Sequence, residues 1–145
     1  MTATRLDLDT ARRVISGALF AARSRNFKPL TVAVLDAGGA LVALEREDGS
    51  SPMRPAIAVG KANGAVQMGL GSRALMKRAE QQPFFIQSMN ALAGGSLVPV
   101  PGGVLLKSED GVVLGAVGVT GDTSDNDEIS ALAGAQAAGL HGETG

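Results

Sequence analysis

Residues 101–140 constrain the fold more than any other stretch, because strand, turn, strand and helix signals follow one another directly. Residues 104–106 are apolar, Asp110-Gly111 is a hairpin signal of the type I′ kind, and residues 112–120 are rich in β-branched side chains. Gly115 and Gly118 interrupt the second run, which predicts that some other part of the molecule packs closely there. The stretch therefore predicts a hairpin that leads into a helix.

The acidic octet at residues 121–128 opens that helix. Thr123, Ser124 or Asp125 can each accept a hydrogen bond at its N-terminus, so the octet is interpreted either as a capped helix start or as a polar site at a sheet edge. Its carboxylates lack the longer, glycine-containing pattern of a calcium loop. No metal site is predicted.

The remaining helices and strands are predicted from the periodicity of apolar residues and from Pro and Gly, which mark where elements end. Residues 7–25 predict a helix capped by Asp7 or Asp9, and residues 30–35 and 41–46 predict a hairpin. Ser51-Pro52 predicts the start of a second helix that runs to about residue 68, and Ser72 predicts the cap of a third at 73–82. Residues 97–100 predict a short edge strand, because Pro99 cannot donate a hydrogen bond within a sheet.

The predicted element order is αββααβββα. Short turns join the strand pairs, so we expect an α+β fold with a five-stranded antiparallel sheet flanked by helices. A length of 145 residues fits a single domain over residues 1–145.

Composition excludes several classes of function. Thirteen basic residues nearly balance 14 acidic ones, and the only aromatic residues are four Phe, so nucleic acid is not an expected partner. The absence of Cys excludes disulfides, Cys-zinc sites and thiol nucleophiles. No signal-like or membrane-spanning apolar run is found, so we expect a cytoplasmic protein without a membrane partner.

One face of the predicted second helix carries only small or polar residues, which favours close packing against another backbone, either in the same chain or in a second subunit. Its members are Ala56, Gly60, Asn63, Gly64 and Gln67. Lys61 lies beside this face.

Five segments resemble the GlcG/HbpS family of haem-degrading-domain proteins, which includes the C-terminal domain of PduO-type corrinoid adenosyltransferases. They are VAVLDAGGALVALERED (32–48), AVGKANGA (58–65), GSRAL (71–75), VPVPGGVLL (98–106) and GAVGVTGDTSDNDE (115–128). The resemblance implies a profilin-like or roadblock-like sandwich that assembles as a homodimer or a larger symmetric homo-oligomer. Because some members bind haem, it also implies a small-molecule-binding protein, with haem or another tetrapyrrole as the leading ligand and the cofactor otherwise unknown.

The candidate site residues combine family motif positions with the chemistry of the side chains. Lys61 and Asp127 are the candidate acid/base or electrostatic pair, or else a structural ion pair that joins two helices or two subunits. Three arginines are candidates for binding an anion, and three apolar side chains for contact with a ligand's apolar body. The full set of candidate ligand-binding residues is Arg46, Arg54, Arg73, Phe84, Phe85, Met89, Gly102, Gly103, Gly121, Asp122 and Asn126.

Two other functions remain open. One is a cofactor-independent enzyme for a small organic acid or pathway intermediate, with Lys61 and Asp127 in its mechanism. The other is a non-catalytic oligomeric scaffold. The single histidine, His141, lies in a Gly-rich tail that we expect to be frayed, so the sequence predicts neither a catalytic triad nor an iron ligand there.

Overall fold

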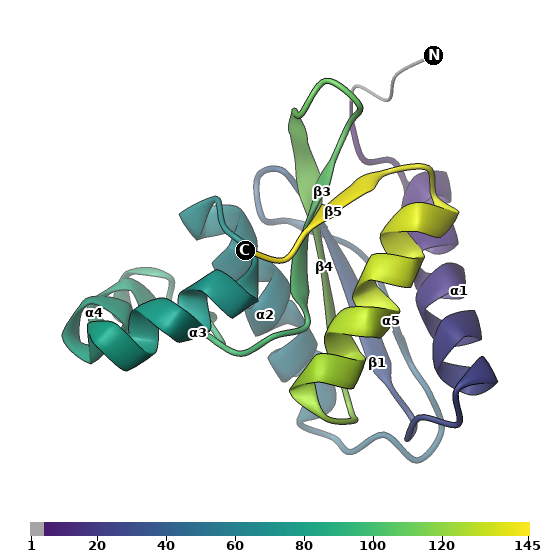
Figure 1. Ribbon diagram of the computed structural model, residues 1–145, viewed down its shortest axis with the longest axis horizontal. Coiled ribbons are helices and arrows are strands. Elements are labelled where there is room, and N and C mark those ends of the chain that lie inside the picture. The colour runs from purple at the N-terminus through teal and green to yellow at the C-terminus, as the bar shows by residue number, and fades with distance from the viewer. Residues whose placement is uncertain (1–4) are drawn as a thin grey trace.

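The computed structural model describes residues 5–145 and has an α+β fold (Figure 1). All strand pairs are antiparallel, and the sheet order is β2-β1-β4-β3-β5. The predicted five-stranded antiparallel sheet with flanking helices is confirmed. The elements are α1 (Leu8–Ser24), β1 (Thr31–Asp36), β2 (Leu41–Arg46), α2 (Arg54–Met68), α3 (Ser72–Gln81), α4 (Pro83–Leu92), β3 (Gly103–Lys107), β4 (Val113–Thr120), α5 (Ser124–Ala137) and β5 (His141–Glu143).

Helices cover both faces of the sheet, which therefore has two apolar layers (Figure 1). Side chains alternate along each strand. Val32 and Val34 of β1 join the larger core with α1 and α5, whereas Leu35 joins the smaller core with Ala62 of α2. Because both faces are covered, the central strands β1, β4 and β3 are mostly apolar and buried, and β1 is buried along its first five residues. No helix in residues 5–145 is both long enough and apolar enough to cross a bilayer.

The fifth strand is not the predicted segment at 97–100, which forms no strand. That segment packs on α2 instead, where the Val98 N–H donates to the Gly60 carbonyl at 3.1 Å. The edge position beside β3 belongs to β5, which pairs His141 with Lys107. The expectation of a frayed tail is therefore wrong, because the tail gains backbone partners that only the tertiary fold supplies.

Two predicted helix starts are also wrong. A helix with Pro52 as its first residue would place Pro55 where an N–H must bond back to Ser51, and Pro has none. Accordingly α2 begins at Arg54, with Pro55 in its first turn. Ser72 does not cap α3. The cap residue is Gly71, and the Ser72 hydroxyl accepts the Gly103 N–H at 2.7 Å.

The glycines of β4 confirm the predicted close approach. A Cβ on Gly118 would lie 1.9 Å from the carbonyl oxygen of Ala58 in α2, and one on Gly115 would lie 2.1 Å from that of Leu35 in β1. The backbone of α2 therefore packs directly against the backbone of β4, with no side chain between them at Gly118. The Asp110-Gly111 turn is also present, although only Gly111 has a positive φ, 82°, so it is not a type I′ turn.

The two glycines of the small-residue face of α2 pack within the chain. A Cβ on Gly60 would lie 2.6 Å from Val98, and one on Gly64 would lie 3.1 Å from Leu97. The close packing predicted for this face is confirmed, and the segment at 97–98 is its partner.

Candidate functional site

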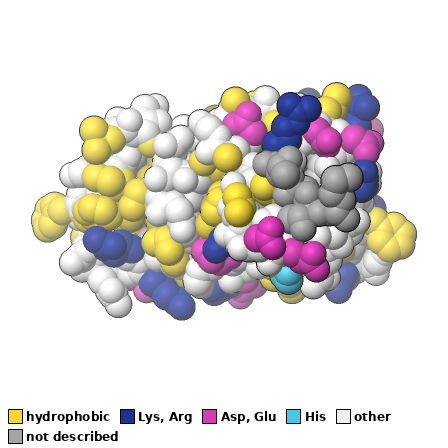
Figure 2. Space-filling model, turned by 90° about the horizontal axis from the view of Figure 1, so that it is seen from above, with side chains coloured by type: hydrophobic (Ala, Val, Ile, Leu, Met, Phe, Trp, Pro, Cys, Tyr) yellow, Lys and Arg dark blue, Asp and Glu magenta, His cyan; other side chains and the backbone are white. Residues whose placement is uncertain are grey.

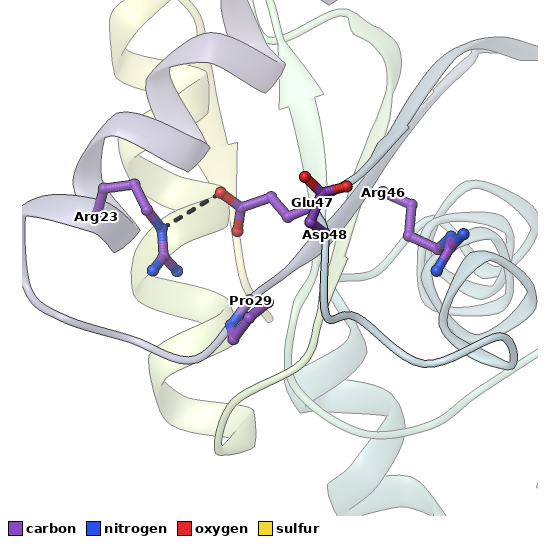
Figure 3. A pocket seen from close by; sticks show the side chains of 5 residues that line it. All are labelled: Arg23, Pro29, Arg46, Glu47 and Asp48. Carbon is purple, nitrogen blue, oxygen red and sulfur yellow. Dashed lines mark ion pairs between the residues drawn. The ribbon is translucent and has the colours of Figure 1, made fainter.

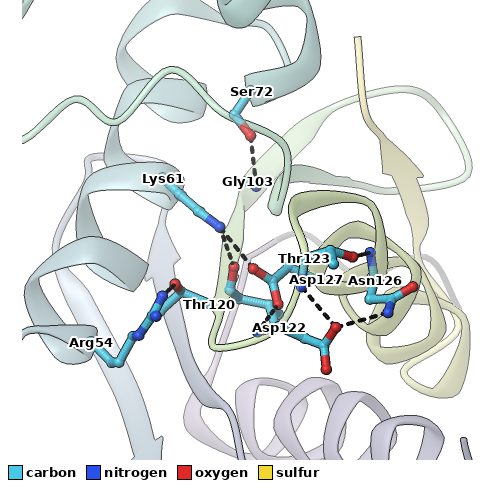
Figure 4. Close-up of polar contacts among 10 residues, drawn as sticks. Arg54, Lys61, Ser72, Gly103, Thr120, Asp122, Thr123, Asn126 and Asp127 are labelled. Carbon is cyan, nitrogen blue, oxygen red and sulfur yellow. Dashed lines mark hydrogen bonds and ion pairs between the residues drawn. The ribbon is translucent and has the colours of Figure 1, made fainter. Parts of the chain in front are cut away.

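The acidic octet forms the turn between β4 and α5, at one end of the sheet (Figure 4). Gly121 has a φ of 143°, and a Cβ there would lie 2.3 Å from the Pro29 carbonyl oxygen. Thr123 is the cap of α5, and its hydroxyl accepts the Asn126 N–H at 3.2 Å. The interpretation of the octet as a helix start is confirmed.

Lys61 and Asp127 form an ion pair between α2 and α5 (Figure 4). The Lys61 Nζ lies 3.1 Å from Asp127 Oδ2 and donates a second hydrogen bond, of 2.9 Å, to the Val119 carbonyl. Their side chains are only 3% and 2% exposed. Asp127 Oδ1 also accepts the Asp122 N–H at 3.0 Å. The pair thus joins two helices of one chain across the end of β4.

Burial governs the titration of this pair. Desolvation lowers the pKa of the Lys61 ammonium, and the attraction of Asp127 opposes that shift. Desolvation likewise raises the pKa of the Asp127 carboxyl, against the attraction of Lys61. A lowered lysine pKa is typical of acid/base sites, but here every contact of the pair lies inside the protein.

The Asp122 carboxylate does not contact Lys61 and instead accepts three hydrogen bonds. Its carboxylate accepts the Lys28 N–H and the Thr123 N–H, each at 2.7 Å, and the Asn126 amide at 2.8 Å. These hydrogen bonds lower the pKa of Asp122. The candidate residues Asp122 and Asn126 therefore bind each other and the turn.

Gly102 and Gly103 lie directly beneath Lys61. A Cβ on Gly102 would lie 2.9 Å from the Lys61 Nζ, and one on Gly103 would lie 2.3 Å from the Lys61 carbonyl oxygen. The Gly103 N–H is already bonded to Ser72. This pair of glycines lets the backbone approach α2 closely, and the N–H of Gly103 is engaged inside the fold.

The three candidate arginines do not converge on one point. Arg54 donates to the Thr120 hydroxyl at 2.7 Å, near the Lys61–Asp127 pair (Figure 4). Arg73 of α3 contacts two acidic residues of α5, Asp125 at 2.5 Å and Glu128 at 3.0 Å. Arg46 donates to the Ser50 carbonyl at 2.7 Å and lines a different pocket.

That pocket lies between the end of α1 and the end of β2, and its volume is about 470 Å³ (Figure 3). Its lining residues are Arg23, Pro29, Arg46, Glu47 and Asp48. Arg23 is paired with Glu47 at 3.3 Å, while Arg46 points away from that pair. Because each cation already has a partner and two acids line the wall, this pocket is a weak site for an anion.

The candidate apolar residues lie on α4, which packs on α3 at one end of the molecule (Figure 1). Phe84 is 83% exposed and Leu92 is 82% exposed. The Arg78 Cζ lies 4.1 Å from the centroid of the Phe85 ring, and Met89 is half-buried. Figure 2 shows hydrophobic side chains gathered at this end of the molecule. The structure thus does not bring this apolar face together with the Lys61–Asp127 pair.

One surface was missed by the sequence analysis. A groove of about 700 Å³ lies along β5, and it is lined by Leu70, Lys107, His141, Gly142, Glu143, Thr144 and Gly145. His141 is exposed, and Lys107 is paired with Glu143 at 2.5 Å. A three-residue strand has no readable periodicity, so the sequence carried no signal for it. Within residues 5–145, no cluster of three or more His, Asp or Glu side chains could hold a bare metal ion.

Comparison with known proteins gives a consistent family assignment. The model of the family described as "Haem degrading protein HbpS-like" matches residues 6–136. No curated protein sequence matches. HbpS, whose structure has also been solved as a double mutant from Streptomyces reticuli, is 28% identical, with a TM-score of 0.80 over 94% of this chain and 92% of that one.

Two further structures share the fold at lower identity. A complex of PduOC with haem is 22% identical, with a TM-score of 0.83 over 94% of this chain and 97% of that one. The protein ORFY of Klebsiella pneumoniae is 21% identical, with a TM-score of 0.81 over 94% of each chain.

Proposed function

Because the chain belongs to the HbpS-like family, we propose that it is a small-molecule-binding protein whose ligand is haem or a related tetrapyrrole. Binding is preferred over catalysis because the charged groups of Lys61 and Asp127 are already hydrogen-bonded to other groups of the protein. Both are buried, and both are bonded within the chain. An acid/base pair must reach its substrate, and this pair contacts only protein.

The chain contains one side chain that could ligate a haem iron. Porphyrin supplies four nitrogens to iron, so the protein needs to provide only one or two axial ligands. The chain has no Cys or Tyr, but it has one exposed His. The bound haem would supply the iron and an apolar ring, and the protein would supply the axial ligand, apolar contacts and a cation for the propionates.

Self-association is the second candidate property, and the exposed apolar face of α4 favours it. Large side chains that are four-fifths exposed on one short helix are typical of an interaction surface. We propose that a second copy of the chain covers this face, which suits either a binding protein or a scaffold. The alternative is that a ligand covers this face, in contact with Phe84, Phe85 and Met89.

Titration of the purified protein with haemin, followed by absorption spectroscopy, tests the binding proposal. The expected result is a shifted Soret band that saturates near one haem per subunit. Native mass spectrometry of the same sample should show the added haem mass in a defined oligomer. An unchanged free-haemin spectrum at excess protein would overturn the proposal, and the enzyme or scaffold function would then be favoured.

A further inference from the structure

Residues 96–102 lie between α4 and β3 and cover part of the Lys61 side chain (Figure 1). The Val98 N–H donates to the carbonyl of Gly60, the chain neighbour of Lys61, at 3.1 Å. A Cβ on Gly102 would lie 2.9 Å from the Lys61 Nζ. The middle of the segment is partly exposed. A thin layer of irregular chain therefore separates this buried lysine from solvent.

Few bonds hold the segment against the rest of the protein. Two of its seven residues are prolines, which cannot donate a backbone hydrogen bond. The Ser96 carbonyl accepts the Asn63 side-chain amide at 2.8 Å. The Gly102 carbonyl accepts the Val119 N–H at 2.9 Å, and Leu97, only 4% exposed, is the segment's buried anchor. A segment held by so few contacts opens at a lower free-energy cost than unfolding of the whole protein.

Glycines lie at both ends of the segment. Gly94 and Gly95 have φ values of 69° and 83°, and a Cβ on either would meet no atom within 4 Å beyond its chain neighbours. Gly102, at the other end, has a φ of 123° and is followed by Gly103. Because glycine adopts either sign of φ, both ends can change direction, while the prolines keep the middle stiff.

Lys61 has a hydrogen bond to offer once the segment moves. Its ammonium carries three N–H groups, and two of them are bonded to the Val119 carbonyl and to Asp127 (Figure 4). Within residues 5–145, no acceptor meets the third. A carboxylate is the ligand group that suits it, because a hydrogen bond between two charged groups is stronger than one between neutral groups.

We propose that residues 96–102 form a lid that opens about these glycines and admits the carboxylate of a small ligand to the third N–H of Lys61. The bond to Asp127 stays in place, so α2 and α5 remain joined while the lid is open. Such a lid suits a small-molecule-binding protein, whether or not its ligand is haem.

A reversible disulfide tests the lid. A Cβ on Gly60 would lie 3.5 Å from the Val98 Cβ, a separation found in disulfides, and the chain has no cysteine of its own. In Gly60→Cys/Val98→Cys, oxidation should lock the lid and dithiothreitol should release it. The measurement is reductive methylation of lysines with formaldehyde, followed by peptide mass spectrometry. Lys61 should react about tenfold or more slowly in the oxidised form, whereas exposed Lys77, the internal control, should react equally in both.

The wild type separates lid opening from global unfolding without any substitution. Its Lys61 methylation should rise less with urea than hydrogen exchange at the Val117 amide in the core of β4, because opening a lid exposes little surface. Equal Lys61 rates in the oxidised and reduced forms, or a urea dependence that matches Val117, would overturn the lid. Circular dichroism of the reduced variant checks that it folds.

Acetate is the probe for the carboxylate. Compared with chloride at the same ionic strength, acetate should slow methylation of Lys61 in the wild type and leave Lys77 unchanged. A Lys61 rate that is the same in both salts would overturn the carboxylate assignment and leave the lid standing. None of these measurements uses haem, so failure of the wild type to bind haemin would overturn the proposed ligand without overturning the lid.

Discussion

The Nζ of Lys61 lies 3.1 Å from Oδ2 of Asp127, and this pair, sealed from solvent, joins α2 to α5 across the end of β4. Each partner needs the other, because a charge left alone in the interior has lost its hydration without compensation. We therefore expect the pair to stabilise the fold, and the glycines at 102 and 103 let the chain pass close to Lys61.

Lys61→Met should lower the free energy of unfolding by about 3–5 kcal/mol, because Asp127 would be left buried without its counter-ion. Urea denaturation monitored by circular dichroism measures this. The double variant Lys61→Met/Asp127→Asn should regain much of the loss, since the amide stays neutral and can still accept the Asp122 N–H. Arg13→Ala, which removes an exposed pair with Asp9, is the control and should change little. A Lys61→Met protein as stable as Arg13→Ala would contradict the structural role.

Asp122→Asn should destabilise the protein in a pH-dependent way. Hydrogen bonds from Lys28, Thr123 and Asn126 lower the pKa of Asp122 from its ordinary value of 3.8. A lowered folded-state pKa means that the carboxylate stabilises the protein at pH values above 3.8, and that this stabilisation is lost as the pH falls through the folded-state pKa. The melting temperatures of the two proteins should therefore differ at pH 7 and converge below pH 3.8. A difference that stayed constant down to acid pH would show that charge is not the cause.

Much of the fold was readable from the sequence, because periodicity and turn chemistry are local. The hairpin of β1 and β2, the glycines of β4 and the cap at Thr123 all follow from residues close together in the chain. The fifth strand was not readable, because β5 is defined by its partner β3 and not by its own three residues. The start of α2 was misplaced because Pro52 was taken as its first residue, although Pro55, which has no N–H, could not then bond back to Ser51.

The candidate site was readable only in part. Lys61 and Asp127 were predicted as a pair from family motifs, and the structure brings them together, but sequence alone does not reveal that both side chains are buried. The apolar residues of α4 were assigned to the same site because nothing in the sequence shows that α4 lies apart from the sheet. His141 was set aside because a short Gly-rich tail has no signal of its own.

Gly118→Ala should destabilise the protein by about 1–3 kcal/mol, because the new methyl group would lie 1.9 Å from the Ala58 carbonyl oxygen and would push α2 away from the sheet. Thermal unfolding by calorimetry measures the effect. Gly38→Ala is the matched control, since its nearest neighbour, the Asp36 Oδ1, lies 3.5 Å away, an ordinary contact. Equal melting temperatures for the two variants would mean that α2 and β4 are less closely packed than the structure indicates.

Phe84→Ser separates the two uses proposed for the exposed face of α4. If a second copy covers this face, the variant should shift toward monomer in sedimentation velocity, because a large apolar anchor is lost. If the face contacts a ligand instead, the oligomer should be unchanged and haemin affinity should fall. Phe20→Ser is the control, since Phe20 on α1 is similarly exposed, at 76% against 83%, and lies outside this face. A Phe84→Ser protein that matches Phe20→Ser in both mass and haemin affinity would exclude both uses, and the apolar face would then need another partner.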